Sequence, residues 1–140
     1  MNFVYNEFKF LLSNGQINLL TDTLKILLVN SYSVDIDNHN FVSDISAYEI
    51  IGGGYTSGGQ VLLNQAVIRN DVNNRTQLTA SNLQWPTSYI NANGGIIYKD
   101  TGDKTTSPLI CFIDFGGQKS TNNTPFIIEW SVQEGILYIT

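Results

Sequence analysis

The only histidine of the chain lies among residue types that are common in catalytic and metal sites. His39 follows Asp35 and Asp37, and Ser31 and Ser33 come shortly before them. These residues formally allow a Ser-His-Asp arrangement. However, the serines fall in a polar loop, and no G-x-S-x-G turn leads into a helix. We therefore expect His39 to be a loop residue or a hydrogen-bond partner of Asp37, and we expect no enzyme activity.

The same segment has the beginning of a calcium-binding pattern. Asp35 and Asp37 are spaced as positions 1 and 3 of an EF-hand loop. Position 6 needs glycine and is Asn40, and position 12 needs a bidentate glutamate and is Ser46. An irregular calcium site stays open as an alternative. No other segment has metal-ligand spacing, so we expect neither a metal nor a cofactor.

A glycine-rich segment marks the middle of the chain. Five of the twelve glycines lie between Ile50 and Leu63. A phosphate-binding loop is not indicated, because no Gly-Lys-Ser/Thr follows. Glycine clusters are typical of backbone with positive φ or of backbone that passes close to another strand. The sequence therefore predicts a structural turn made by Gly54, Tyr55, Gly58 and Gly59.

Exposed aromatic residues would allow a carbohydrate-binding surface, which we keep as an alternative. Aromatic rings can stack on sugar faces while Asn and Asp donate and accept hydrogen bonds. Tyr98 and Trp130 alternate with strand neighbours, which favours a place in the core for both. The five candidates for such a surface are Tyr55, Trp85, Tyr89, Tyr98 and Trp130.

Composition limits the possible partners. The 140 residues are 42% hydrophobic and 14% charged, which fits one domain over residues 1–140 with a substantial core. The net charge is −5 and the seven Lys and Arg residues are scattered, which argues against nucleic acid. No apolar run approaches the ~20 residues of a membrane span, and we expect no signal peptide at the N-terminus. The few charges suit broad contacts with other proteins.

The first residues of the chain have the spacing of a helix, and an aliphatic segment follows them. Apolar residues recur at helical intervals from Phe3 to Leu12, which predicts a short amphipathic helix. Asn2 is the expected N-cap, and residues 13–15 with their glycine are the expected stop. Leu24–Val29 is short and aliphatic and predicts a buried strand.

The second half of the chain has alternating patterns separated by turn residues. Cys111 lies within one apolar run, so we expect a buried thiol. Gly116 and Gly117 are expected to end that strand. Together these patterns predict a mainly β protein, an antiparallel β-sandwich or jelly-roll with one short N-terminal helix. The expected strands are 61–69, 75–80, 83–86, 96–99, 109–115, 126–130 and 136–139.

Several motifs occur in an order that resembles a known family. They include Asp35-Ile36-Asp37-x-His39-x-Phe41, Gly54-Tyr55-Thr56-x-Gly58-Gly59, Ile97-Tyr98-Lys99-Asp100-Thr101-Gly102 and Ser107-Pro108-Leu109-Ile110. In this order the chain resembles small structural proteins of tailed-bacteriophage virions. The segment Asn91-Ala92-Asn93 departs from the pattern, since a basic or β-branched residue is expected there.

The resemblance implies a structural role in a virion assembled in the cytoplasm of a bacterial host. The favoured function is capsid decoration, in which the protein cements the head lattice by binding the major capsid protein. A tail, neck or baseplate component is the second hypothesis, and a carbohydrate-binding module of the virion is the third. The resemblance also implies contacts with other virion proteins and a homo-oligomer, with a trimer favoured.

A decoration protein needs surfaces or arms that contact a pre-formed lattice. The N-terminal segment and the extended loop 31–40 are the expected arms. The candidate interface residues are Phe3, Tyr5, Tyr32, Asp35, Asp37, His39 and Phe41.

Overall fold

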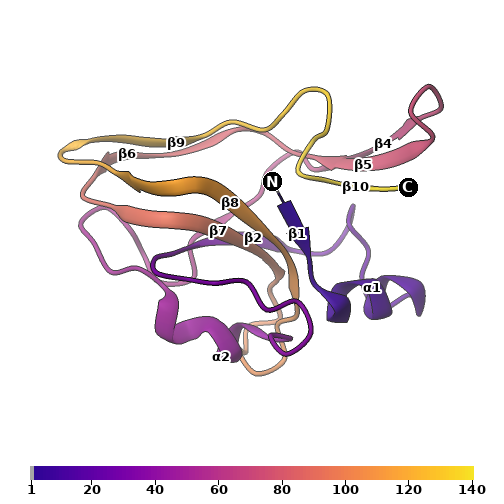
Figure 1. Cartoon of the computed structure of the whole chain (residues 1–140), viewed down its shortest axis with the longest axis horizontal. Helices are drawn as coiled ribbons and strands as arrows, with labels where there is room; N and C mark the ends of the chain where they lie inside the picture. The colour runs from indigo at the N-terminus through magenta and orange to yellow at the C-terminus, as the bar shows by residue number, and fades with distance from the viewer. Residues whose placement is uncertain (1) are drawn as a thin grey trace.

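The computed structural model describes residues 2–140 and shows a mainly β protein with one short N-terminal helix, as the sequence predicts. Antiparallel strands form two layers packed face to face (Figure 1). The strands are β1 (Asn2–Val4), β2 (Leu24–Val29), β3 (Gln60–Val61), β4 (Ala66–Asn70), β5 (Arg75–Thr79), β6 (Leu83–Ser88), β7 (Asn91–Lys99), β8 (Leu109–Ser120), β9 (Thr124–Ile128) and β10 (Leu137–Ile139); the helices are α1 (Asn6–Ser13), α2 (Val42–Ile45) and the 3-10 turn η1 (Ser46–Tyr48).

The first layer is a five-stranded sheet in the order β1-β8-β7-β2-β3. Both of its faces are covered, which explains why five of the six residues of β2 are apolar. Leu24, Ile26 and Leu28 of β2 pack into the core between the layers. Leu27 and Val29 point to the opposite face, where a second core lies beneath α2 and the loop before it.

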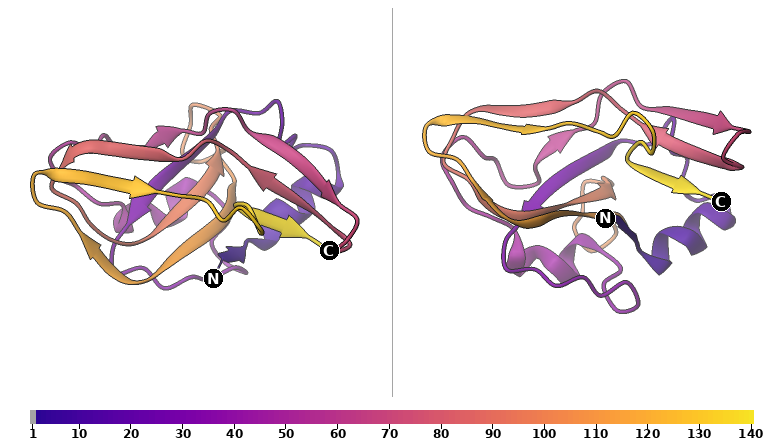
Figure 2. Two further views of the ribbon diagram at one scale, coloured as in Figure 1. Left: turned by 90° about the horizontal axis from the view of Figure 1, so that it is seen from above. Right: turned by 45° about the horizontal axis from the view of Figure 1, so that its top comes forward.

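The second layer combines a two-stranded sheet, β6-β9, with a three-stranded sheet, β10-β5-β4. Figures 1 and 2 show the three-stranded sheet extending past the end of the first layer and lying over α1. We call this sheet with its β4–β5 turn the flap, residues 66–79 and 137–139. Leu78 and Leu137 are buried and anchor its inner end in the core between the layers.

The helix begins later than the sequence indicates. Residues 2–4 are a strand, in which Phe3 pairs with Phe112 of β8. Tyr5 is the N-cap, so the predicted cap at Asn2 is wrong. A helix of about ten residues is marginal on its own, and pairing with β8 gives these residues a better alternative. The predicted end is confirmed, with the C-cap at Asn14 and Gly15 at φ 81°.

Two predicted strand boundaries are wrong for reasons of backbone conformation. The segment 61–69 is not one strand, because Asn64 takes the left-handed conformation with φ 56° and separates β3 from β4. Conversely, β8 continues through Gly116 and Gly117, whose φ values are 73° and 139°. The register with β7 shifts across them, so these glycines form a bulge within the strand.

Strand β7 begins at Asn91, five residues before the predicted start at Ile96. The added part contains Gly94 and Gly95, which the apolar pattern does not register as strand. A side chain at Gly94 would come within 2.2 Å of the Phe112 ring, and one at Gly95 within 2.8 Å of Ile26. These glycines therefore let large core residues pack directly on the strand.

Candidate functional site

Two of the predicted interface residues are core residues. Tyr5 is fully buried and Tyr32 nearly so. Their hydroxyls hydrogen-bond at 2.8 Å, and the Tyr32 hydroxyl also lies 2.9 Å from Nδ1 of His39. Burial raises the pKa of both tyrosines. The prediction that Tyr5 and Tyr32 contact a partner is therefore corrected, because these rings join the loop to the sheet.

The loop 31–40 is a closed turn rather than an arm. The carboxylate of Asp35 accepts hydrogen bonds from the backbone N–H of Asp37 at 3.2 Å and of Asn38 at 3.0 Å. The side chain of Asn38 donates another at 2.9 Å, and these bonds hold the pKa of Asp35 below its usual range. Asp37 accepts a hydrogen bond from the side chain of Asn6 in α1. The loop is thus fastened both to itself and to the helix.

The other candidate interface residues stay within reach of solvent. The ring of Phe3 is half-buried and stacks on Phe112 with 6.2 Å between centroids. Phe41 is also half-buried, and its backbone N–H donates to Asp44 at 2.9 Å. The role of Phe3, Asp35, Asp37, His39 and Phe41 in an interface stays a prediction.

The glycine-rich turn has the conformation that the sequence predicts. Gly54, Gly58 and Gly59 have φ values of 79°, 93° and 76°. A Cβ at Gly59 would lie 1.7 Å from the carbonyl oxygen of Ile26, and one at Gly54 would lie 2.2 Å from that of Thr87. The turn is therefore pressed between β2 and β6, where only glycine fits.

Glu49 organises this turn, although no sequence motif marks it. Its carboxylate accepts hydrogen bonds from the Tyr55 hydroxyl at 2.7 Å, the Ser57 hydroxyl at 3.0 Å and the Gly58 N–H at 2.7 Å. The Tyr55 hydroxyl in turn accepts from the N–H of Leu28 at 3.0 Å, and burial raises its pKa. One acidic residue just before the glycine run was the only available signal.

The five aromatics considered for sugar binding do not form one surface. Trp85 and Tyr98 are buried, and the Tyr98 hydroxyl donates to the Gly58 carbonyl at 2.6 Å. The indole N–H of Trp130 donates to the Ser81 carbonyl at 3.1 Å. Of the five, Tyr89 alone is exposed. The expected core position is confirmed for Tyr98. The prediction that Trp85 could stack on a sugar is wrong, because its ring is buried.

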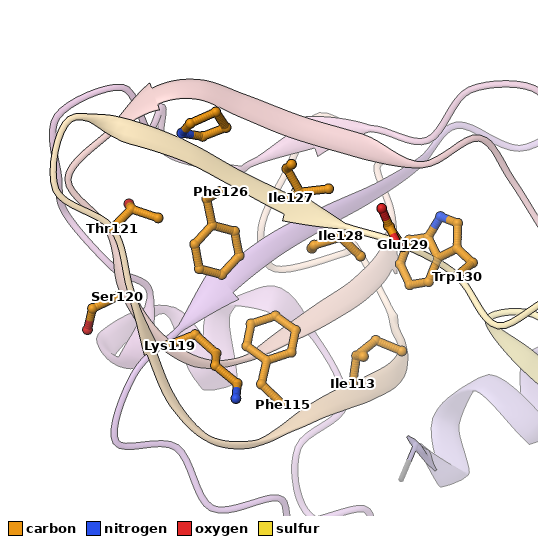
Figure 3. Close-up of a pocket in the computed structure, with 11 residues that line it drawn as sticks. Ile113, Phe115, Lys119, Ser120, Thr121, Phe126, Ile127, Ile128, Glu129 and Trp130 are labelled. Atoms are coloured by element: carbon orange, nitrogen blue, oxygen red, sulfur yellow. The ribbon is translucent and has the colours of Figure 1, made fainter.

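An apolar groove of about 390 Å³ lies between β8 and β9 (Figure 3). Phe115 from β8 and Phe126 from β9 meet inside it, with 5.9 Å between ring centroids. A second hollow of about 610 Å³ continues toward β10 and shares three lining residues with the first. Both Glu129 and Glu134 line the second hollow, and both are exposed to solvent.

The flap displays apolar side chains to solvent along its length. Val72 in the β4–β5 turn is 91% exposed. The guanidinium of Arg75 covers the ring of Tyr138 at 4.4 Å from its centroid, a cation–π contact that favours this position of the ring. The other apolar side chains of the flap that are 39–44% exposed are Val67, Ile68, Tyr138 and Ile139.

The remaining chemistry-bearing groups are few. Cys111 is buried as expected, and burial raises the pKa of its thiol. Among residues 2–140, no three His, Cys, Asp or Glu side chains are grouped to hold a metal ion. No helix in the same part of the chain is long and apolar enough to cross a membrane.

No family profile, curated protein or solved structure matches this chain. The function of the protein is therefore inferred from the residues and contacts described above.

Proposed function

We propose that this protein is a structural component of a tailed-bacteriophage particle that acts by binding neighbouring virion subunits. Capsid decoration is the favoured role, with the major capsid protein as the principal partner. The observation that best supports the proposal is the flap. It extends past the end of the first layer and exposes apolar side chains (Figure 1). The order of motifs along the sequence supports the assignment to a virion.

The flap has the properties of a contact surface. Its exposed side chains come from both faces of the sheet, because Val67 and Ile68 are consecutive residues in β4. Exposed apolar side chains on both faces of a protruding sheet leave apolar area available for protein association. The Arg75–Tyr138 contact presents a preordered aromatic ring, a residue type that is enriched at such interfaces.

The rest of the protein is held together by hydrogen bonds between distant segments, which favours binding. Glu49 ties the glycine-rich turn together through three hydrogen bonds, and the Tyr5–Tyr32–His39 contacts hold the loop 31–40. Segments that are already ordered lose less conformational entropy when they bind. A preordered body suits repeated docking on a lattice of identical sites.

A tail, neck or baseplate component is the alternative, since the same flap would serve there. A carbohydrate-binding module is a weaker alternative, because Trp85 and Tyr98 are buried and Tyr89 is the one exposed ring of the five. The copy number in purified particles separates the first two roles. A number close to that of the major capsid protein supports decoration, and a far smaller number assigns the protein to the tail or neck.

Rebinding to particles stripped of the protein tests the role of the flap. Val72→Asp places a charge on the flap, and Val132→Asp places the same charge on an equally exposed residue elsewhere. We expect the first variant to bind at least tenfold more weakly and the second to bind like the wild type. Rebinding that neither variant affects would contradict the role of the flap, and absence of the protein from particles would contradict the function.

A further inference from the structure

The free edges of the β6-β9 sheet are protected by proline. The carbonyl of Gln84 accepts a hydrogen bond from the side chain of Gln60 at 2.8 Å, so this carbonyl points away from β9. The next residue, Trp85, therefore directs its backbone groups to its partner Phe126. By the same alternation, Pro125 of β9 faces the open edge, where it provides no N–H. The other edge is irregular at Pro86, where the register between β6 and β9 shifts between Trp85 and Ser88.

The other edges are interrupted or short. Beyond Ile113, the outer edge of β8 contains the bulge at Gly116 and Gly117. Strands β1, β3 and β10 have three residues or fewer. Natural proteins use these devices to prevent edge-to-edge association.

Strand β4 has none of these protections. It runs for five residues and pairs with β5 without a register shift, from Ala66↔Thr79 to Asn70↔Arg75. It contains no proline, and its neighbouring residues Val67 and Ile68 are both exposed. Within residues 2–140, it is the one long and regular edge that stays uncovered.

The direction of the unpaired backbone groups of β4 follows from the hydrogen bond of a neighbouring strand. The carbonyl of Leu78 accepts from the N–H of Ile136 at 2.7 Å, so the backbone groups of Leu78 point toward β10. Leu78 lies opposite Val67 in the register. Val67 must therefore direct its N–H and C=O to the free edge, and so must Arg69 two residues later.

The edge also carries little net charge. Arg69 is the only charged residue of β4, and its Nε lies 2.6 Å from the carboxylate of Asp71. A lone charge on an edge strand normally discourages pairing, but here the opposite charge lies on the same hairpin.

We infer that β4 is a self-association site that pairs antiparallel with β4 of a second copy, around a two-fold axis through Ile68. In this register, Val67 of each copy lies opposite Arg69 of the other. The outward N–H and C=O groups of both residues then bond across the axis. Ile68 meets its own copy as a non-hydrogen-bonded pair, the arrangement with the closest side chains. The two flaps join into one continuous sheet.

This inference deepens the proposed function, on which it rests, by naming a second copy as the partner of the β4 edge. A two-fold contact uses the same strand twice and needs no second matching edge. The trimer favoured from the sequence would need a contact between two different edges. The edges other than β4 are short, bulged or interrupted by proline, so the structure favours a dimer.

The mass of the purified full chain, measured by light scattering over a range of concentrations, tests the inference. We expect a dimer that Ile68→Lys weakens at least tenfold, because two ammonium groups would meet on the axis. Val72→Lys adds the same charge to the same hairpin beyond the paired residues and should leave the dimer intact. Circular dichroism and thermal unfolding establish that each variant folds.

A cysteine cross-link tests the register independently. Ile68→Cys should form a disulfide between copies on mild oxidation much faster than Val72→Cys, and the buried Cys111 does not compete. A monomer at all concentrations, a trimer insensitive to Ile68→Lys, or equal cross-linking of the two variants would overturn the inference. A monomer that still binds stripped particles would overturn the self-association alone, whereas a dimer that binds none would contradict only the proposed function.

Discussion

The glycine-rich turn and the flap differ in how far their side chains are paired or covered. The turn is hydrogen-bonded and packed, whereas the flap leaves apolar side chains exposed. In the turn, the Glu49 carboxylate is hydrogen-bonded to three partners, and Gly59 lies against the backbone of β2. In the flap, apolar side chains such as those of Val72 and Ile68 remain exposed to water. A fully hydrogen-bonded network fixes one conformation, whereas exposed apolar surface remains available for binding.

This comparison indicates where substitutions will be costly. Changes in the turn should act on folding, because the groups there have no alternative partners. Changes at the outer flap should act on association and leave folding nearly unchanged.

The largest effect is expected from Gly59→Val. A Cβ at Gly59 overlaps the Ile26 carbonyl, and the φ of 76° disfavours a branched side chain. We expect a loss of more than about 4 kcal/mol in the free energy of unfolding, measured by urea denaturation. Gly102→Ala is the matched control, because Gly102 has a φ of 87° with open space around it. Its cost should be about 1 kcal/mol, and equal costs would contradict the close approach.

Glu49→Gln should have the next largest effect. The amide retains the size of the carboxylate but loses its charge and half of its acceptor oxygens. Since hydrogen bonds to charged groups are worth about 1.5–3 kcal/mol, we expect a destabilisation of about 2–3 kcal/mol. Glu129→Gln, on an exposed residue, should change the urea midpoint very little. A similar stability for the two variants would remove Glu49 from its organising role.

Tyr32→Phe should destabilise by about 1–3 kcal/mol, because it leaves the buried Tyr5 hydroxyl unpaired. Adding Tyr5→Phe removes the orphaned hydroxyl and should restore part of the loss. A double-mutant cycle by thermal unfolding measures the coupling. Strictly additive losses would show that the two hydroxyls do not depend on each other.

Acid should weaken the attachment of the loop between β7 and β8. The N–H of Gly102 and the ammonium of Lys25 hold the pKa of Asp100 below its ordinary value of 3.8. Because the folded pKa is the lower one, the stabilisation is present above pH 3.8 and is lost as the pH falls through the folded pKa. Urea midpoints between pH 6 and pH 2 should therefore fall less steeply in Asp100→Asn than in the wild type. Parallel slopes would be inconsistent with this role.

Val72→Ser should have the smallest effect on folding. The side chain is almost fully exposed, so its loss should change the free energy of unfolding by less than about 0.5 kcal/mol. The same variant should bind less 8-anilinonaphthalene sulfonate or a similar apolar dye. A large fall in the melting temperature would show that the flap belongs to the folding core.

The sequence patterns were informative where one strand or turn determines the outcome. The aliphatic run of β2 and the positive φ of Gly54, Gly58 and Gly59 follow from local residue types. The role of Glu49 was not accessible, because it depends on contacts with residues up to nine positions away along a folded turn.

Exposure was the property least accessible from sequence. Tyr32 lies in a polar loop, but its ring packs edge-on against Phe112 of β8. Val67 and Ile68 have the apolar character of a buried strand, yet their sheet extends past the layer that would cover it. In both cases the deciding contact, or its absence, involves a segment distant in the chain.

The connection between the flap and the body has a mechanical consequence. Strand β5 continues into β6, and β9 continues into β10. Two segments of the chain therefore connect the flap to the same end of the β6-β9 ribbon. At its far end the ribbon runs into β7 and β8. Tension on the flap would travel along both segments in parallel and would not pull β6 away from β9, so a load from a neighbouring subunit would reach the five-stranded sheet through covalent bonds.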